Sequence, residues 1–237
     1  MIFIKLRERD QKDHNTIITV SLCLILLLAF YARFPAIPVP YLWHDEAWRA
    51  DLIVAAPSPQ AAVTYAAHER LFIQFSEWVF GWCGLFLLGQ TTMAFRIWPL
   101  LFAMFGLIGI YLLVATISSR YAALLATLFI GIGAGFVQHA REFKPYALDL
   151  ALTVWTLYAV ASVSREQRKN TKIFLAILLH LFALFSLVFV FIFPAVLVAR
   201  FRSLKFRWGR DLVFLFSSFS VFVVMYFCFL KPQQVWS

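Results

Sequence analysis

The chain has 237 residues, of which 62% are hydrophobic and only 14% charged, and its formal net charge is +9. Soluble proteins contain roughly 25% charged residues, so this composition excludes a soluble globular domain and predicts an integral membrane protein. In such a chain the excess of Lys and Arg bears first on membrane orientation, and we expect no nucleic-acid partner.

Long apolar runs predict an all-α, polytopic membrane protein that forms a single module. The first run nearly crosses a bilayer core at about 1.5 Å per residue, and the poor cleavage site around Ala32 favours a retained span over a signal peptide. Later apolar runs lie at 93–117, 121–137, 146–163, 173–199 and 212–230. The predicted segments are a cytoplasmic tail at 1–16, a first span at 17–34, an external loop at 35–92, the remaining spans at 93–230 and an external tail at 231–237.

Two runs differ from an ordinary span. The run at 71–88 is rich in Trp and Phe and contains three polar residues, which favours an interfacial helix along the lipid headgroups. The run at 173–199 begins and ends at basic segments, so we expect a helical pair that turns near 186–194. One long tilted span is the alternative. The module therefore contains about seven transmembrane or half-spanning helices and an external loop with interfacial helices.

The charged residues divide between the two faces of this topology. The N-terminus, the turn at Arg120 and the segments at 164–172 and 200–210 share one face, with 4, 1, 4 and 5 basic residues, or 14 of the 21. Cytoplasmic loops carry such an excess, so we expect the N-terminus in the cytoplasm. The outer face receives seven of the 12 acids, namely Asp45, Glu46, Asp51, Glu69, Glu77, Glu142 and Asp149.

An acidic pair, Asp45 and Glu46, lies in the external loop soon after the first span. Carboxylates accept protons from hydroxyl groups or hold divalent metals, and charge beside a membrane is costly, so the pair predicts a functional site. The alternative is that both acids cap an external helix through the positive end of its dipole. Acids and bases also cluster on this face at Asp45, Glu46 and Arg49, at His68, Glu69 and Arg70, and at Arg141, Glu142, Lys144, Tyr146 and Asp149.

The order of these features resembles a known family. A charged N-terminus and one span precede the acidic pair, and an interfacial aromatic helix, the motif Ala94–Phe95–Arg96 and the segment REFKPYALD at 141–149 follow it. This order resembles the GT-C-type glycosyltransferases, within them the superfamily of protein mannosyltransferases, which use dolichyl-phosphate mannose, and aminoarabinose transferases. The resemblance covers nearly the whole chain. It implies transfer of a sugar from a polyprenyl-phosphate donor to an acceptor at the outer membrane surface, commonly with inversion.

The resemblance also implies roles for individual acids. Asp45 matches the catalytic acid of the first loop and would act as the general base toward the acceptor hydroxyl. Glu46 matches its partner, which orients the acceptor or a metal, and Asp149 matches an acid at the outer end of the fourth span with a shift of one residue. Oxygen ligands suit magnesium or manganese, so Asp45, Glu69 and Asp149 are candidate metal ligands.

Substrate binding is expected from seven further residues, namely Arg49, Glu69, Arg70, Arg141, Glu142, Lys144 and Tyr146. A departing polyprenyl phosphate gains negative charge, which Arg stabilises through paired donors and Lys as a point charge. Arg49 resembles the first-loop Arg of the family, with a shift of one position. Glu69 and Arg70 resemble its Glu–Lys pair, and a solvated surface pair is the alternative for these two.

The expected partners are the polyprenyl-phosphate donor, a protein, lipid or glycan acceptor, and membrane lipids. We expect the bacterial inner membrane as the location, with the site facing the periplasm or exterior. Members of the family usually continue through further spans, so a missing C-terminal half or a partner subunit is expected. A transporter or lipid-translocating protein is the first alternative, because membrane acids and bases also mark substrate pathways, and a non-catalytic subunit is the second.

Overall fold

The computed structural model describes residues 2–36, 38–39, 41–69, 72–166, 169–201 and 208–234, and within them every regular element is a helix. The α-helices of these residues are α1 (Ile2–Arg33), α2 (His44–Ala55), α3 (Pro59–His68), α4 (Phe75–Leu88), α5 (Thr92–Ile117), α6 (Arg120–Ile132), α7 (Ala134–His139), α8 (Tyr146–Glu166), α9 (Lys169–Phe185), α10 (Phe189–Phe201), α11 (Trp208–Met225) and α12 (Lys231–Gln234). A 3₁₀-helix, η1 (Phe34–Ala36), follows α1, and a π-helix, η2 (Tyr226–Leu230), continues α11. The predicted all-α class is confirmed for this part of the chain.

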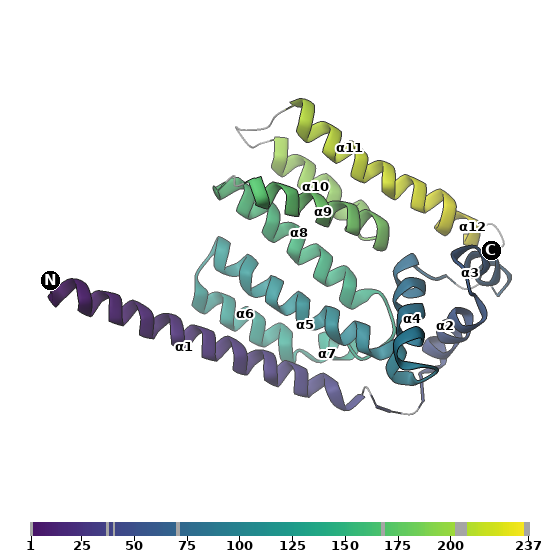
Figure 1. Cartoon of the computed structure of the whole chain (residues 1–237), viewed down its shortest axis with the longest axis horizontal. Coiled ribbons are helices and arrows are strands. Elements are labelled where there is room, and N and C mark those ends of the chain that lie inside the picture. Colours follow the sequence, from purple (N-terminus) through teal and green to yellow (C-terminus); the bar gives the residue numbers. More distant parts are fainter. Residues whose placement is uncertain are drawn as a thin grey trace.

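The longer helices run roughly along one direction, as Figure 1 shows. α6 packs on both α1 and α5, and α5 packs on α8. α8 also packs on α9 and α10, and α9 packs on α11. The short helices α2, α3 and α12 gather with α4 at the end where the C-terminus lies (Figure 1). We call α2, α3, α4 and α12 the cap, and α1, α5, α6 and α8 to α11 the bundle.

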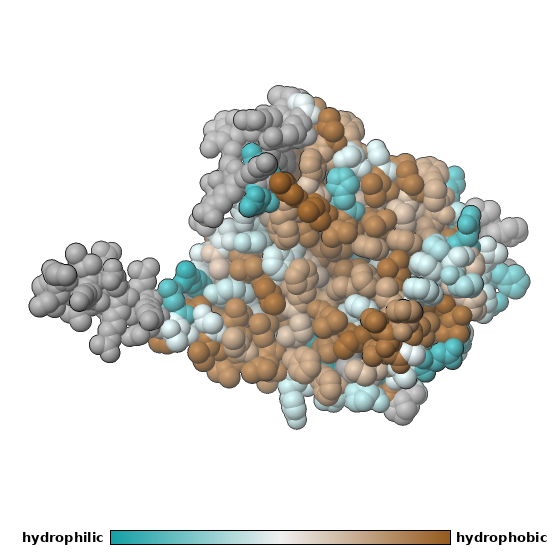
Figure 2. All heavy atoms as spheres, in the orientation of Figure 1, coloured by the Kyte–Doolittle hydropathy of each residue, from teal (hydrophilic) through white to brown (hydrophobic). Residues whose placement is uncertain are grey.

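Within the residues that the structure describes, four helical stretches are long and apolar enough to cross a membrane, namely His14–Arg33, Thr92–Ile117, Tyr146–Val163 and Leu212–Gln233. The bundle remains apolar on its outer face, where Leu24, Leu27 and Phe129 are each more than 60% exposed. Figure 2 shows hydrophobic residues spread over the bundle. Extended apolar surface of this kind marks contact with lipid or with a partner protein, and together with helices of this length it indicates a membrane-integral protein.

The observed helices follow most of the predicted runs. The run at 173–199 is a helical pair, as predicted, because α9 ends at Phe185 and α10 begins at Phe189. The run at 121–137 is not one helix: the backbone leaves the helical region at Gly133, with φ −59° and ψ 126°, and α7 starts there. α6 and α10 have 13 residues and α9 has 17, fewer than the roughly 20 that cross a bilayer core.

α4 is the described part of the run predicted to lie at the interface. It has 14 residues and crosses the direction of the bundle helices in Figure 1. The rings of Trp78, Trp82 and Phe86 stack along it, with centroids 6.4 and 6.0 Å apart. Trp82 and Phe86 are exposed. Exposed aromatic side chains are typical of the membrane interface, so these observations favour the interfacial placement.

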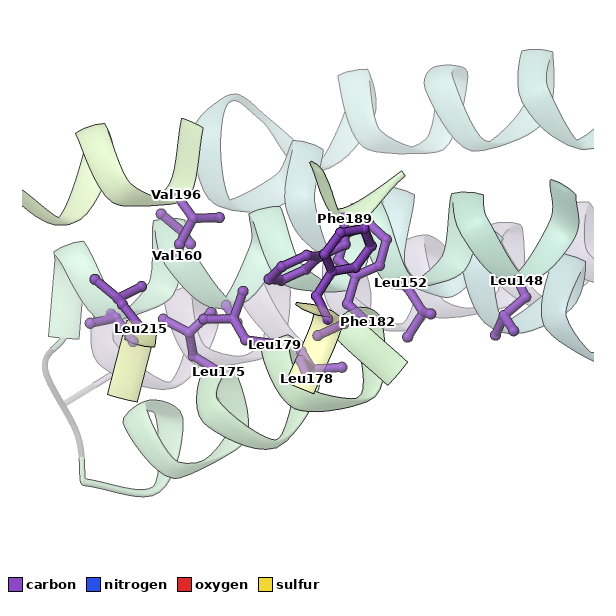
Figure 3. Packing of buried hydrophobic residues seen from close by; sticks show 14 residues of the cluster. Leu148, Leu152, Val160, Leu175, Leu178, Leu179, Phe182, Phe189, Val196 and Leu215 are labelled. Carbon is purple, nitrogen blue, oxygen red and sulfur yellow. The ribbon is translucent and has the colours of Figure 1, made fainter. Parts of the chain in front are cut away.

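The largest buried cluster joins α8, α9, α10 and α11. Phe182 and Phe189 are completely buried at its centre and meet edge to face, with ring centroids 5.9 Å apart (Figure 3). Leu152 of α8 and Leu215 of α11 belong to the same cluster. Lipid is as apolar as these side chains, so close packing rather than removal from water holds such helices together.

A second buried cluster holds the cap on the bundle. It contains Ile53 of α2, Phe143 of the α7–α8 connection and Phe229 of η2. Gln233 of α12 adds polar contacts, because its side chain accepts the N–H of Ile73 at 2.9 Å and donates to the carbonyl of Ile73 at 3.1 Å. The chain segment before α4 is thereby fixed against the end of the described chain.

Candidate functional site

The acidic pair lies in the first turn of α2. Glu46 accepts the backbone N–H of Trp43 at 2.9 Å, just before the helix begins at His44. A carboxylate at this place satisfies a free helix donor and interacts favourably with the positive end of the helix dipole. Glu46 therefore caps α2, as the simpler interpretation of the pair predicts.

The carboxylate of Glu46 is completely buried and is held from three sides. Besides Trp43, its Oε2 accepts from Arg96 of α5 at 2.7 Å, and its Oε1 accepts from the backbone N–H of Phe143 at 2.5 Å. A buried carboxylate needs such partners, since desolvation costs several kcal/mol. The bonds fix α2 against α5 and the α7–α8 connection. This geometry favours a structural part for Glu46 over the predicted contact with acceptor or metal.

Asp45 lies in a different environment from the buried Glu46, because its side chain is 50% exposed. Its Oδ2 lies 2.7 Å from Lys144 Nζ, which also pairs with Glu142 at 2.9 Å. The hydrogen bond from Lys144 lowers the pKa of Asp45 by more than partial burial raises it. Partial burial lowers the pKa of Lys144, but hydrogen bonds to Asp45 and Glu142 outweigh this and raise it to about 12. At neutral pH Asp45 is therefore ionised and Lys144 positively charged.

Another ion pair joins the cap helices α2 and α4. Arg49 donates to Glu77 Oε1, and Glu77 Oε2 accepts the backbone N–H of Gln74 at 2.8 Å, which caps α4. The Glu77 side chain is 3% exposed, whereas that of Arg49 is 25% exposed. Arg49 is therefore partly exposed on the same helix as the acidic pair.

Asp149 lies one turn into α8 and is 9% exposed. It accepts the hydroxyl of Ser186, whose Oγ in turn accepts the backbone N–H of Val188 at 3.2 Å. Since Ser186 stands at the break between α9 and α10, Asp149 fixes that break against α8. Glu77 lies close enough to Asp149 for the two carboxylates to repel each other. Asp149 thus adjoins the cap acids without bonding to them.

A small pocket lies between α4, α5 and the α7–α8 connection. It has about 250 Å³ of empty space, part of it open to solvent. Within the described residues, Ser76 Oγ and Trp98 Nε1 are buried there without a hydrogen-bond partner. The walls are mostly apolar with a few polar groups, and the enclosed space admits little more than a water molecule. The wall consists of Ser76, Glu77, Phe80, Trp98, Pro99, Phe102, Phe143, Lys144, Pro145 and Leu148.

The three predicted metal ligands do not form one ligand set. Asp45 pairs with Lys144 and Asp149 with Ser186, while Glu69 is exposed and lies 3.0 Å from its neighbour His68. No group of three His, Cys, Asp or Glu side chains within the described ranges is arranged to hold a metal ion. The three residues therefore do not form a shared metal site in this structure.

Arg141 and Tyr146, two further predicted binding residues, do not line the pocket. Tyr146 is 48% exposed, and its ring meets that of His139 edge to face. Arg141 donates to the backbone carbonyl of Ala32 at the end of α1. Arg70 falls outside the described residues. Of the predicted site, the structure brings together Asp45, Glu46, Glu142 and Lys144, with Arg49 on the same cap helix.

Sequence reasoning missed the partners that organise the site. In the sequence, Arg96 stands out only as part of the motif that begins at Ala94, and Glu77 only as one of the outer-face acids. Ser186 stands out only as the start of the range where a turn is expected. The available signal was the isolation of Arg96 and Glu77 in apolar runs, where a charged residue needs a partner. Their partners could not be identified, because Arg96 and Glu46 are 50 residues apart.

Comparisons with protein-family models, with curated proteins and with solved structures found no match to this chain. The function of the chain is therefore inferred from the chemistry of Asp45, Lys144 and the adjoining pocket.

Proposed function

We propose that the chain is a membrane glycosyltransferase. It transfers a sugar from a polyprenyl-phosphate donor to an acceptor hydroxyl with inversion, and Asp45 acts as the general base. In this proposal all seven bundle helices cross or partly cross the bacterial inner membrane. The N-terminus lies in the cytoplasm, and the cap faces the periplasm or exterior.

The course of the chain supports this orientation. In Figure 1, α1 runs toward the cap and α5 runs away from it, so the turn at Ser118 and Ser119 lies at the end opposite the cap. Arg120 follows that turn, and α1 begins at the same end with a segment, residues 1–15, that contains four basic residues (Figure 1). An excess of Lys and Arg is typical of the cytoplasmic face, and this supports an outer position for the cap.

The contact between Asp45 and Lys144 is the observation that carries the proposal. A general base needs an ionised oxygen that a substrate hydroxyl can reach, and Asp45 is half exposed and ionised. Lys144 lies 2.7 Å away and also lines the pocket, so a positive charge stands beside the base. A base next to a cation matches a reaction that removes a proton while a phosphate leaves.

The same contact provides a way to activate the base. Held by Lys144, Asp45 has a lowered pKa and is therefore a weak base. In our mechanism, Lys144 turns from Asp45 to an oxygen of the donor phosphate, and this change raises the pKa of Asp45. Arg49, partly exposed on the same helix, provides a second cation for the phosphate.

The proposed transfer needs only the acceptor and the polyprenyl-phosphate donor as reactants. The acceptor oxygen attacks the anomeric carbon, and its proton moves to Asp45. The bond between the anomeric carbon and the phosphate oxygen breaks, and its electron pair stays on the phosphate. Attack from the side opposite the phosphate inverts the anomeric carbon.

The full chain in lipid vesicles tests this function with radiolabelled polyprenyl-phosphate hexoses and pentoses. We expect transfer by the wild type and a loss of about 10²-fold to 10⁴-fold in Asp45→Asn, the usual contribution of a general base. Asp51→Asn is the matched control, since Asp51 is another exposed acid of α2. Unimpaired transfer by folded Asp45→Asn would contradict the assignment.

The two alternatives give different results in the same vesicles. A translocating protein would move labelled polyprenyl phosphate across the bilayer without releasing its sugar. A non-catalytic subunit would show no transfer alone and would co-purify with a transferase whose activity survives Asp45→Asn.

A further inference from the structure

Two arginines, Arg33 and Arg141, meet where α1, α6 and α7 come together. Arg33 ends α1 and is 1% exposed, and it donates to the backbone carbonyls of Ala29 and, at 2.6 Å, Gly131. Arg141 donates to the carbonyl of Ala32. The two guanidinium groups are close enough to repel each other. Two positive charges thus share one partly buried place.

The described residues around Arg33 and Arg141 do not neutralise the positive charges of the two side chains. Within the described ranges, neither arginine lies within ion-pair distance of a carboxylate, and the Nε atom of each is buried without a hydrogen-bond partner. The carbonyls that they contact belong to the last turns of α1 and α6, where the helix dipole supplies only about half a negative charge. The positive charge of this pair is therefore left for an anion to neutralise.

The pair lies at the level expected for lipid headgroups. Arg33 ends one candidate membrane span, and Arg141 stands shortly before another, which begins at Tyr146. Beside Arg33, the rings of Phe30 and Phe34 are exposed and stack with centroids 5.3 Å apart. Aromatic side chains next to arginines are typical of the membrane interface, where lipid phosphate groups lie.

We propose that Arg33 and Arg141 form a binding site for the phosphate group of an anionic membrane lipid. Arg141, which is half-buried, contacts the phosphate, and the fully buried Arg33 supplies the second charge behind it. Guanidinium groups bind phosphate through paired N–H donors, which the partly exposed side chain of Arg141 supplies. The acyl chains lie along the exposed rings at the end of α1. This site is separate from the Asp45 and Lys144 contact and does not depend on glycosyl transfer.

Native mass spectrometry tests the site with the full chain in phosphatidylcholine nanodiscs that contain phosphatidylglycerol. We expect the wild type to retain phosphatidylglycerol in preference to phosphatidylcholine. Arg141→Gln should retain about tenfold less, the effect of losing one charge-assisted hydrogen bond. Arg141→Lys should fall between the two, because it keeps the charge and loses the paired donors. Arg33→Lys tests the second arginine and should also weaken retention.

Arg120→Gln is the matched control, because Arg120 is an exposed arginine at the other end of the bundle and bonds to Asn15. It should retain lipid like the wild type. Parallel samples with polyprenyl phosphate and with inorganic phosphate identify the source of the phosphate. Selective retention of polyprenyl phosphate, lost in Arg141→Gln, would support the site with that lipid as its occupant. Binding of inorganic phosphate alone, or equal lipid retention by the wild type and Arg141→Gln, would overturn it.

Discussion

In the cap, charged side chains from separate elements meet in pairs, whereas the large cluster of the bundle joins apolar side chains. Glu46 with Arg96 and Arg49 with Glu77 connect α2 to α5 and α4. Phe182 and Phe189 represent the bundle, where close contact of rings joins the helices. Ion pairs fix the positions of individual atoms, and apolar packing tolerates exchange of similar side chains. The cap therefore fixes individual side chains in place, and the bundle supplies a membrane-compatible support.

The largest effect should come from breaking the buried pair of the cap. Glu46→Ala leaves Arg96 without its carboxylate and Phe143 N–H without its acceptor. Removing one member of a buried ion pair costs about 3–5 kcal/mol, so we expect a large fall in the free energy of unfolding. Thermal unfolding of the purified protein in detergent measures it.

Glu69→Ala is the control for that variant, because Glu69 is an exposed acid of the same cap region. Its expected change is within about 0.5 kcal/mol. Equal stability of Glu46→Ala and Glu69→Ala would show that the buried pair does not hold the cap.

A middle-sized effect should come from the contact between cap and bundle. A Cβ atom added at Gly84 of α4 would lie 1.9 Å from the carbonyl oxygen of Ala94 in α5. Because that neighbour is backbone, Gly84→Ala must push the two helices apart, and we expect a loss of about 1–3 kcal/mol in detergent unfolding. Gly135→Ala has open space around the added atom and should be neutral or slightly stabilising.

The smallest effect should come from the exposed pair of the cap. Asp45 has a lowered pKa, so its contribution to stability is present above its ordinary pKa of 3.8 and is lost as the pH falls through the folded value. Lys144 has a pKa raised to about 12, so its contribution is full below 10.5 and is lost as the pH rises through 12. Because Asp45 is half exposed, the acid loss should stay below about 1 kcal/mol.

Melting temperatures across the pH range, compared with those of Asp45→Asn, measure this effect. The acid loss should shrink in the variant, because its side chain no longer titrates. An acid loss of the same size in both proteins would assign it to other carboxylates.

Long apolar runs predicted most helices, because a run such as 93–117 has one plausible structure in a membrane. The basic segments at both ends of 173–199 predicted the break between α9 and α10, where Ser186 joins Asp149. The break at Gly133 was missed because glycine inside an apolar run does not by itself end a helix. For the site, the sequence located the acids, but it did not predict that Glu46 is buried while Asp45 is half exposed. That distinction depends on Arg96, which is near Glu46 only in the fold.

The proposed glycosyl transfer requires the cap on the outer membrane face and the α5–α6 turn on the inner face. Single cysteines at Asp51 of α2 and Ser118, both exposed, test this most directly in a protein whose Cys23, Cys83 and Cys228 are replaced. A maleimide that cannot cross membranes should label Asp51→Cys in intact cells, and Ser118→Cys only after the membrane is opened. Labelling of both positions from outside, or of Ser118→Cys alone, would contradict the placement of Asp45 on the outer face.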